Sequence, residues 1–423
     1  MESIVLTSVF VLALLASLAV KFWLSSRQVR HVLAHRHAVP DAFAGAVSLS
    51  AHRKAADYTA ARNRLGLLST AWGAAVLLGW TLLGGLEALN DVVHSAVYPS
   101  FGGLAYQLAL VAAFSVVSGL LDLPFELYTT FRLEQRFGFN RMTWRLWAAD
   151  TAKGLLVGVV VGLPIAALIL WIMGATGPMW WLWAWGAWVA FNLLALVLYP
   201  TVIAPLFNSF QPLADASLSA RVQALMARCG FQAKGLFVMD GSRRSAHANA
   251  YFTGMGAAKR VVFFDTLLSK LNGGEVEAVL AHELGHFKHR HVVQRMVMLF
   301  GLSLAGFALL GWLSGQVWFY TGLGARPSLD APNDALALLL FLLVTPVFSF
   351  FVAPLMSRLS RKHEFEADAY ACAQANGNDL AAALLKLHED NAATLTPDPL
   401  YARFWYSHPP ASERIAALRL QTG

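Results

Sequence analysis

The sequence predicts an all-α polytopic membrane protein with a small α+β domain on the cytoplasmic side of the bilayer. Two observations support this fold class: a strongly apolar composition, and apolar runs of spanning length that recur along the chain. Of the 423 residues, 57% are hydrophobic and 13% are charged, whereas soluble domains carry about 25% charged residues. The formal net charge of +7 does not indicate a nucleic-acid partner, because the basic residues flank apolar runs, as they do at a membrane surface.

Seven apolar runs are long enough to cross about 30 Å of hydrocarbon as helices of about 20 residues. They cover residues 4–24, 67–89, 104–127, 155–173, 179–203, 292–319 and 335–356. We expect the first run to be a retained anchor rather than a signal peptide, because Glu2 precedes it and its basic residues follow it.

The positions of Lys and Arg predict the orientation. Nearly all of them lie in four segments between or after the spans, namely 27–64, 128–153, 205–291 and 357–423. By the positive-inside rule these segments face the cytoplasm, so the N-terminus is expected outside and the C-terminus inside. An odd number of spans satisfies both expectations.

The chain is therefore expected to have four parts. Residues 1–204 hold the first five spans with their cytoplasmic loops, and 205–291 form a cytoplasmic insert. Residues 292–356 hold the last two spans, and 357–423 form a cytoplasmic tail. A site built from both insert and tail would be held together by the last two spans.

Within the insert, apolar spacing predicts a helix over 215–229 and a short strand at "GLFVMD". "ANAYFTG" and "RVVFFD" predict a hairpin, because turn residues lie between two aromatic and β-branched runs. A second helix, opened by Glu275, carries "HELGH".

"HELGH" is an H-E-x-x-H motif. On a helix, His282 and His286 are four residues apart and share one face, so both imidazoles can bind one ion. Glu283 lies beside them and can take a proton from a metal-bound water. The motif therefore predicts a hydrolytic zinc site, which needs a third protein ligand and one open position.

The tail offers the third ligand. His289 lies about 10 Å along the helix axis from His282, too far to share its ion. Glu364 of "HEFEAD" is the better candidate, and Asp368, one turn later, can accept the other ring N–H of a ligand histidine. Glu366 is expected to point away from both. We expect His289 and the neighbouring His291 to form a basic cap where the helix enters the membrane, and His363 to lie on the surface.

Two further features have open alternatives. His408 and Arg414 can stabilise the oxyanion of a tetrahedral intermediate, or Ser412 can cap a helix on which Arg414 is a surface charge. The strand "ANAYF" can bind an extended peptide along its edge, with Asn249 adding a side-chain hydrogen bond, or it can be an ordinary buried strand.

Taken together, the motifs resemble the M48 metalloproteases, and within them the integral-membrane CAAX prenyl protease type 1 (Ste24-like) group. The resemblance covers most of the chain, and its motifs follow in the order of that group. They are "LPFELYTTFRLEQRFGFNRMT" at 123–143, "PLFNSFQPL", "HANAYFTG", "AHELGHFKHRH", "SRKHEFEADAYA" and "YSHPPASERI". One departure is Ala248, where the group more often has Ser.

The resemblance implies an architecture and a role for each site residue. Seven long helices are expected to ring a water-filled intramembrane chamber, and the zinc site to cap it from the cytoplasmic side. The implied roles are zinc ligands for His282, His286 and Glu364, catalytic acid/base for Glu283, support of a ligand for Asp368, oxyanion stabilisation for His408 and Arg414, and substrate binding for Asn249.

The leading hypothesis is a membrane-embedded zinc endopeptidase, with one Zn²⁺ per chain, that cleaves near the C-terminus of prenylated (CaaX-type) or hydrophobic peptides. Its expected partners are that peptide or protein substrate and the lipid bilayer, with no nucleic acid. One alternative is a quality-control protease for membrane proteins, without prenyl specificity. Another is a non-catalytic chamber protein that binds lipid or peptide around a structural zinc. Glu283 argues against the last, because a structural site needs no such carboxylate.

The C-terminal sequence "LRLQTG" has no dilysine-type retention signal. This favours a bacterial inner membrane, with the N-terminus outside and the active site in the cytoplasm.

Overall fold

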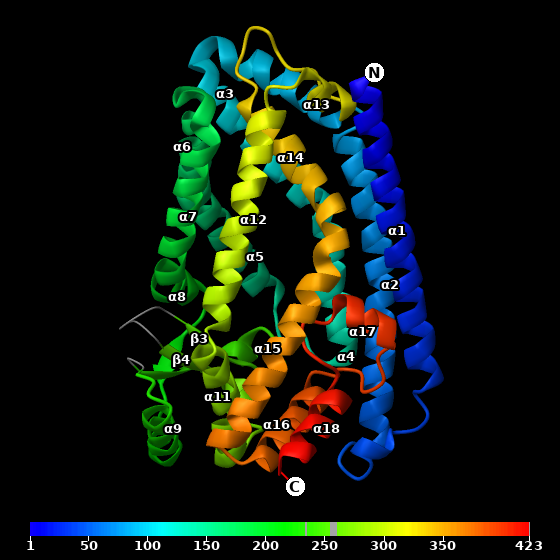
Figure 1. The fold of residues 1–423 in the computed structure, drawn as a ribbon, viewed down its shortest axis with the longest axis vertical. Helices are drawn as coiled ribbons and strands as arrows, with labels where there is room; N and C mark the ends of the chain where they lie inside the picture. The colour runs from blue at the N-terminus through cyan, green and yellow to red at the C-terminus, as the bar shows by residue number, and fades with distance from the viewer. Residues whose placement is uncertain (233–234, 254–259, 423) are drawn as a thin grey trace.

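The protein has two tiers in the computed structural model, which describes all residues except 233–234, 254–259 and 423. Long helices run through the upper tier of Figure 1, and shorter helices with one small sheet form the lower tier. The N-terminus lies at the far end of the long helices, whereas the C-terminus lies among the short ones (Figure 1).

The helices of the upper tier are α1 (Glu2–Ala34), α2 (Leu49–Trp80), α3 (Gly85–Tyr128), α5 (Trp144–Val157), α6 (Leu163–Ala175), α7 (Trp180–Leu198), α12 (His291–Leu313), α13 (Val317–Gly322), α14 (Asp334–Ser349) and the first part of α15 (Ala353–Gln374). The remaining helices are α4 (Gln135–Phe137), α8 (Ala204–Phe207), α9 (Ala216–Arg228), α10 (Asp265–Leu268), α11 (Gly273–Lys288), α16 (Gly377–Asp390), α17 (Pro399–Trp405) and α18 (Ala411–Thr422). The strands are β1 (Phe210–Pro212), β2 (Leu236–Met239), β3 (Ala250–Thr253) and β4 (Arg260–Phe264).

Among the described residues, six helical segments are long and apolar enough to cross a membrane. They are Glu2–Ala34, Gly85–Phe137, Trp144–Ala175, Gly177–Phe207, His291–Leu313 and Asp334–Gln374. The expectation of a mostly helical, polytopic membrane protein is therefore confirmed.

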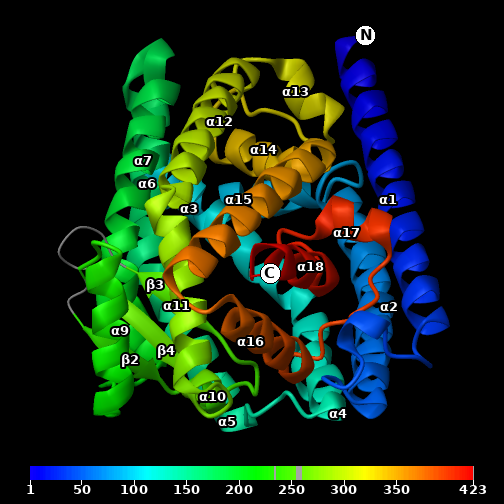
Figure 2. The same cartoon turned by 60° about the horizontal axis from the view of Figure 1, so that its bottom comes forward.

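The predicted second span, 67–89, does not coincide with a single helix. It covers the end of α2 at Trp80 and the start of α3 at Gly85. α2 lies beside α1 in both views (Figures 1 and 2) but is not among the six apolar segments. Its first half carries basic residues such as Arg53 and Lys54. Seven spans therefore stay a prediction.

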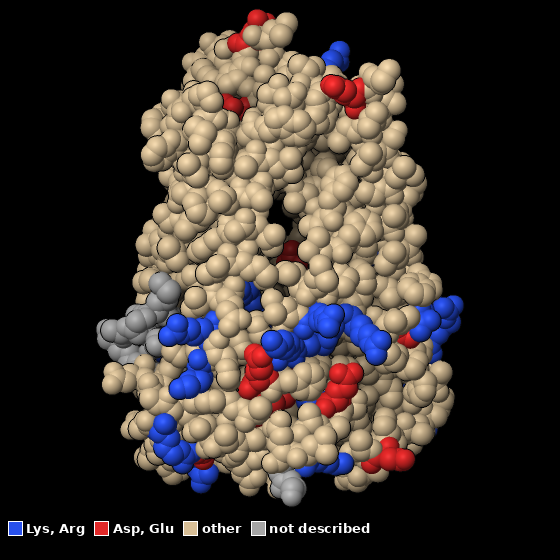
Figure 3. All heavy atoms as spheres, in the orientation of Figure 1, with Lys and Arg blue, Asp and Glu red and all other residues tan. Residues whose placement is uncertain are grey.

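The upper tier exposes apolar side chains on its outside and is hollowed between helices. On α12, Val297 is 67% exposed and Leu302 is 56% exposed, which is what a helix presents to lipid rather than to water. Figure 3 shows a dark opening between α12 and α14, with acidic atoms deep inside it.

The lower tier contains one four-stranded sheet of order β1-β2-β4-β3. β2 and β4 are parallel, β3 and β4 are antiparallel, and β3 therefore forms one edge. The predicted hairpin and the predicted strand at "GLFVMD" are both present, although the turn at 254–259 lies outside the described residues. α9 corresponds to the helix predicted over 215–229.

α11 has a well-defined start and a buried face. The Asn272 side chain accepts a hydrogen bond from the Glu275 N–H (2.9 Å), and the Glu275 carboxylate accepts one from the Asn272 N–H (2.8 Å). This capping box satisfies two helix donors. Val276, Leu280 and Leu284 are buried in the core that α11 shares with α9, the sheet and α16. Both features fix the helix that carries "HELGH".

The tail returns to the first membrane helix. Arg27 of α1 donates to Asp398 over 2.9 Å, and the Gln28 side-chain oxygen accepts from the Asp398 N–H over 2.7 Å. Asp398 also accepts hydrogen bonds from the first N–H groups of α17. Figure 2 shows α17 against α1, and α18 between α15 and α16. The tail is thereby fixed at both ends around the site described next.

Candidate metal centre

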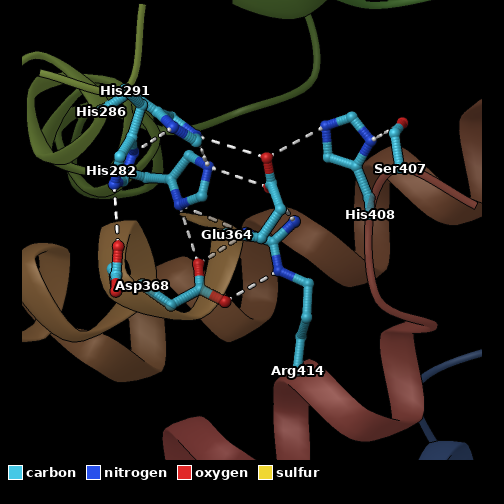
Figure 4. Close-up of polar contacts among 9 residues, drawn as sticks. His282, His286, His291, Glu364, Asp368, Ser407, His408 and Arg414 are labelled. Atoms are coloured by element: carbon cyan, nitrogen blue, oxygen red, sulfur yellow. Dashed lines mark hydrogen bonds and ion pairs between the residues drawn. The ribbon is translucent and has the colours of Figure 1, made fainter. Parts of the chain in front are cut away.

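Two helices that pack against each other, α11 and α15, supply a cluster of two histidines and a glutamate (Figure 4). α11 carries His282 and His286 on one face, and α15 carries Glu364 opposite them. Gly285 lies between the histidines and has no side chain, so α15 can approach α11 closely. These three residues, which we call the trio, are thus brought together from the insert and the tail.

The trio has the spacing of a tetrahedral metal site. His282 Nε2 and His286 Nε2 lie 3.3 Å apart; His282 Nε2 lies 3.4 Å from Glu364 Oε2, and His286 Nε2 lies 3.4 Å from Glu364 Oε1. Ligands of a tetrahedral zinc ion with bonds of about 2.0–2.1 Å are separated by about 3.3–3.4 Å. Two imidazole nitrogens and a carboxylate oxygen are also donor types that zinc prefers. The residues therefore fit a zinc ion.

An unpaired buried oxygen in the trio also supports a bound metal ion. Glu364 Oε2 is a buried oxygen without a hydrogen-bond partner among the described residues. Its residue is 3% exposed. A buried carboxylate oxygen in this state is costly unless a cation or a donor compensates it. A metal ion at the trio would provide that compensation.

The other side of His282 is held by Asp368 and Arg414. His282 Nδ1 lies 2.8 Å from Asp368 Oδ1, and the Arg414 Nε donates to Asp368 Oδ2 over 2.8 Å. Arg414 is 6% exposed, so the alternative of a surface charge is wrong. α18 begins at Ala411, so Ser412 lies inside it rather than at its N-cap. The carboxylate fixes His282 with a proton on Nδ1 and leaves Nε2 free for the metal.

Glu283 is next to the first ligand and is partly buried. Burial raises the pKa of its carboxyl above the ordinary glutamate value, whereas the neighbouring His282 and His286 act in the opposite direction. A carboxyl whose pKa is shifted towards neutrality is suited to accept and return a proton.

His408 approaches the trio from the loop before α18. Its Nε2 lies 3.4 Å from Glu364 Oε1, and its Nδ1 lies 2.9 Å from the Ser407 hydroxyl. The side chain is 64% exposed, so His408 is a solvent-accessible neighbour of the trio.

Sequence reasoning missed a second group beside the trio, formed by His291, His363 and Glu366. His291 is 2% exposed and His363 is 5% exposed, so the expected basic cap and surface position are wrong for these two. His291 Nε2 lies 2.9 Å from Glu366 Oε2. Glu366 does point away from the trio, but it contacts His291, which in turn contacts His286 of the trio.

Asn249 lies outside the cluster of Figure 4, just before the edge strand β3. Its carbonyl accepts the Phe264 N–H over 3.0 Å, and its side-chain oxygen accepts the Ala250 N–H over 2.8 Å. Asn249 itself is exposed. Among the residues that the structure describes, no strand pairs with the outer edge of β3, as strand addition requires.

The apolar helices, the trio and the H-E-x-x-H motif that supplies its two histidines together define an integral-membrane metalloprotease. Comparison with known proteins gives the family. Residues 28–209 match the CAAX prenyl protease N-terminal family, described as five membrane helices, and residues 212–422 match peptidase family M48. The chain belongs to the CAAX prenyl protease 1 (Ste24-like) group of that family.

Individual relatives agree. The chain is 37% identical to CAAX prenyl protease 1 homolog of Oryza sativa subsp. japonica over 338 residues, which are 79% of this chain and 75% of the relative. It is 32% identical to CAAX prenyl protease 1 homolog of Caenorhabditis elegans over 92% of both chains. The crystal structure of S. mikatae Ste24p superposes with a TM-score of 0.90 at 29% identity, over 99% of both chains. These relatives are eukaryotic and do not support the expected bacterial membrane.

Proposed function

We propose that the protein is a zinc endopeptidase that cleaves near the C-terminus of prenylated CaaX-type peptides. The observation that carries this proposal is the trio of His282, His286 and Glu364 with Glu283 adjacent. Its two histidine Nε2 atoms lie 3.3 Å apart, and each lies 3.4 Å from one of the two Glu364 oxygens. A structural zinc site would need a fourth protein ligand instead of a neighbouring free carboxylate.

When bound, zinc supplies Lewis-acid chemistry, polarising the scissile carbonyl and making water more acidic. Glu283 accepts the proton of the attacking water and later returns it to the leaving amine. Asp368 holds the Nδ1 proton of His282, and Arg414 in turn fixes both oxygens of Asp368. The ligand orientation is therefore set before a substrate arrives.

His408 and Arg414 are assigned to the oxyanion. The exposed His408 Nε2 is the donor that a substrate oxygen would meet first. Arg414 has two nitrogens committed to Asp368, whereas its Nη1 lies 3.7 Å from Glu364 Oε2. That nitrogen adds positive charge on the side where the developing negative charge would lie.

The edge of β3 is assigned to the substrate backbone. Because the Asn249 carbonyl accepts from Phe264 of β4, alternation along an antiparallel pair directs the N–H of Ala250 away from β4. Asn249 Oδ1 now accepts this N–H. An extended peptide could replace that contact and add a strand to the sheet.

The proposed function includes a prenyl group on the substrate and a chamber between the membrane helices that holds it. The CAAX prenyl protease relatives support a substrate of that type, and the opening between α12 and α14 (Figure 3) supports a chamber that could hold a lipid. On the face shown in Figure 3, basic residues gather on the lower half. This distribution supports a cytoplasmic active site with the N-terminus outside.

The test uses purified, zinc-loaded protein and its Glu283→Gln variant. Each is given a CaaX peptide with and without farnesyl, and products are identified by mass spectrometry. We expect the last three residues to be released only from the farnesylated peptide and only when Glu283 is present.

The other outcomes distinguish the alternatives. Equal cleavage of both peptides would contradict prenyl specificity and favour a quality-control protease. Unchanged cleavage by Glu283→Gln would contradict the assigned acid/base. No cleavage of either peptide by the wild type would favour a binding role for the site.

A further inference from the structure

We propose that His291 and Glu366 position the zinc ligand His286 through a relay of two hydrogen bonds. This inference rests on the proposed zinc site and concerns residues outside the trio. His286 Nδ1 lies 3.0 Å from His291 Nδ1 (Figure 4), and His291 Nε2 lies 2.9 Å from Glu366 Oε2.

The two hydrogen bonds determine which ring nitrogen of each histidine carries the proton. His286 faces the trio with Nε2, which lies 3.3 Å from His282 Nε2 and 3.4 Å from Glu364 Oε1. A ligand nitrogen carries no proton, so the proton of His286 must be on Nδ1 and is donated to His291 Nδ1. His291 then carries its own proton on Nε2 and donates it to the Glu366 carboxylate.

Both ligand histidines are thus connected to a carboxylate by hydrogen bonds. His282 reaches Asp368 directly over 2.8 Å, whereas His286 reaches Glu366 through His291. Such partners fix the tautomer and ring orientation of a metal-bound histidine and make it a stronger donor. Removing either partner of His286 should therefore weaken zinc binding.

The backbone is built to place His291 in this position. In a continuous helix, residues five apart are rotated by about 140°, so His291 would face away from His286. Arg290, between α11 and α12, has φ 57°. This left-handed conformation is unfavourable for a residue with a side chain, and it breaks the helix so that His291 turns back towards His286.

His363 completes the packing without acting as a ligand. Its ring stacks on His291 with centroids 4.0 Å apart and planes 7° from parallel. The lone pairs of two parallel stacked rings lie in separate planes and cannot converge on one ion. The group of His291, His363 and Glu366 is therefore better explained as support for His286 than as a second metal site.

The test is zinc affinity, measured by competition with a chelator on the purified protein in detergent. His291→Phe keeps a flat ring on His363 but removes both hydrogen bonds, and we expect zinc binding to weaken about 10–100-fold. His291→Gln retains an amide oxygen that can accept from His286, and it should recover most of this loss. Glu366→Gln keeps an acceptor but removes the charge, and it should give a smaller loss.

Two matched controls isolate the relay. His363→Phe preserves the stacked ring on His291 and leaves both hydrogen bonds of the relay in place. Lys362→Gln removes the ion pair between Lys362 and Glu366, whose atoms are 3.5 Å apart. Neither should change zinc affinity. Unchanged affinity in His291→Phe, or equal losses in the Phe and Gln variants, would overturn the relay.

The folding of the variants is checked by Tm. If His291→Phe does not fold, the zinc affinity of Glu366→Gln tests the relay instead, because the Glu366 side chain is 36% exposed and its substitution should not prevent folding. Wild-type zinc affinity in Glu366→Gln would then overturn the proposal. Failure of the wild type to bind zinc would instead overturn the proposed function.

Discussion

Gly285 lies so close to Ala367 that a side chain at position 285 has no room. A Cβ atom added to Gly285 would lie 2.9 Å from the Ala367 Cα and 3.0 Å from its carbonyl oxygen. Both neighbours are backbone atoms and cannot rotate away. Since Gly285 separates the ligand histidines on α11 and Ala367 follows Glu364 on α15, this contact sets the distance across the metal site.

Gly285→Ala should therefore impair the site rather than only the fold. The added methyl group would push α15 away from α11 and lengthen the separation of Glu364 from His282 and His286. We expect zinc affinity and peptidase activity to fall by at least about tenfold, because small displacements of ligands have large effects. Chelator competition and peptide cleavage measure both, and Gly301→Ala is the control, since a Cβ there meets nothing within 4 Å. Wild-type zinc affinity in Gly285→Ala would contradict this explanation.

A second prediction concerns the edge of β3. Ala250→Pro removes an outward N–H that the sheet does not use, so β3 should persist, as proline is tolerated at such edge positions. A substrate that adds a strand there would lose one hydrogen bond, worth about 0.5–1.5 kcal/mol. We expect KM to rise about 2–10-fold with little change in kcat, by the same conversion. Ala250→Ser, which retains the N–H, should behave as wild type. An unchanged KM in the proline variant would place the substrate elsewhere.

A third prediction concerns pH and the docking of the tail. Burial alone would raise the pKa of Asp398, but the Tyr401 N–H and the Arg27 guanidinium bring it below its ordinary value of 3.8. A pKa lowered on folding means that the stabilisation is complete above that ordinary value and is lost as the pH falls through the folded value.

Asp398→Asn keeps the cap of α17, since Asn caps helices as well as Asp, but it removes the charge. It should cost about 1–3 kcal/mol at neutral pH. Thermal unfolding in detergent measures this as a difference in Tm from the wild type, and that difference should shrink as the pH falls below 3.8. A difference that persists unchanged at low pH would show that the charge of Asp398 is not its source.

A fourth prediction follows from the left-handed Arg290. Arg290→Gly relieves a conformation that costs an L-residue about 1–2 kcal/mol, so zinc affinity should be retained and Tm should not fall. Arg290→Val should lower both, because a β-branched residue resists this conformation. Equal behaviour of the two variants, measured by thermal unfolding and chelator competition, would contradict the role of this break.

The sequence was sufficient for two members of the trio, because helical spacing alone places His282 and His286 on one face, whereas Glu364 on a separate helix was a candidate supported by the family resemblance. The strands and α9 could be predicted for similar reasons, since their apolar periodicity is local. The bounds of the second predicted span do not match one helix, because α2 ends at Trp80 within an apolar run that continues into α3, and a hydropathy profile does not detect that break.

The relay behind His286 could not be found in the same way. His291 is five residues away, on the wrong face of a continuous helix, and the left-handed residue that redirects it is an arginine rather than a glycine. The contact between Arg27 and Asp398 joins residues 371 positions apart. Such contacts depend on how the tail packs, and periodicity carries no signal for them.

The most direct test of the central claim is an anomalous difference map from crystals of the zinc-loaded protein, recorded at the zinc absorption edge. The account predicts one strong peak per chain, about 2.0–2.1 Å from His282 Nε2, His286 Nε2 and a Glu364 oxygen. No peak at the trio, or a peak among His291, His363 and Glu366 instead, would contradict it.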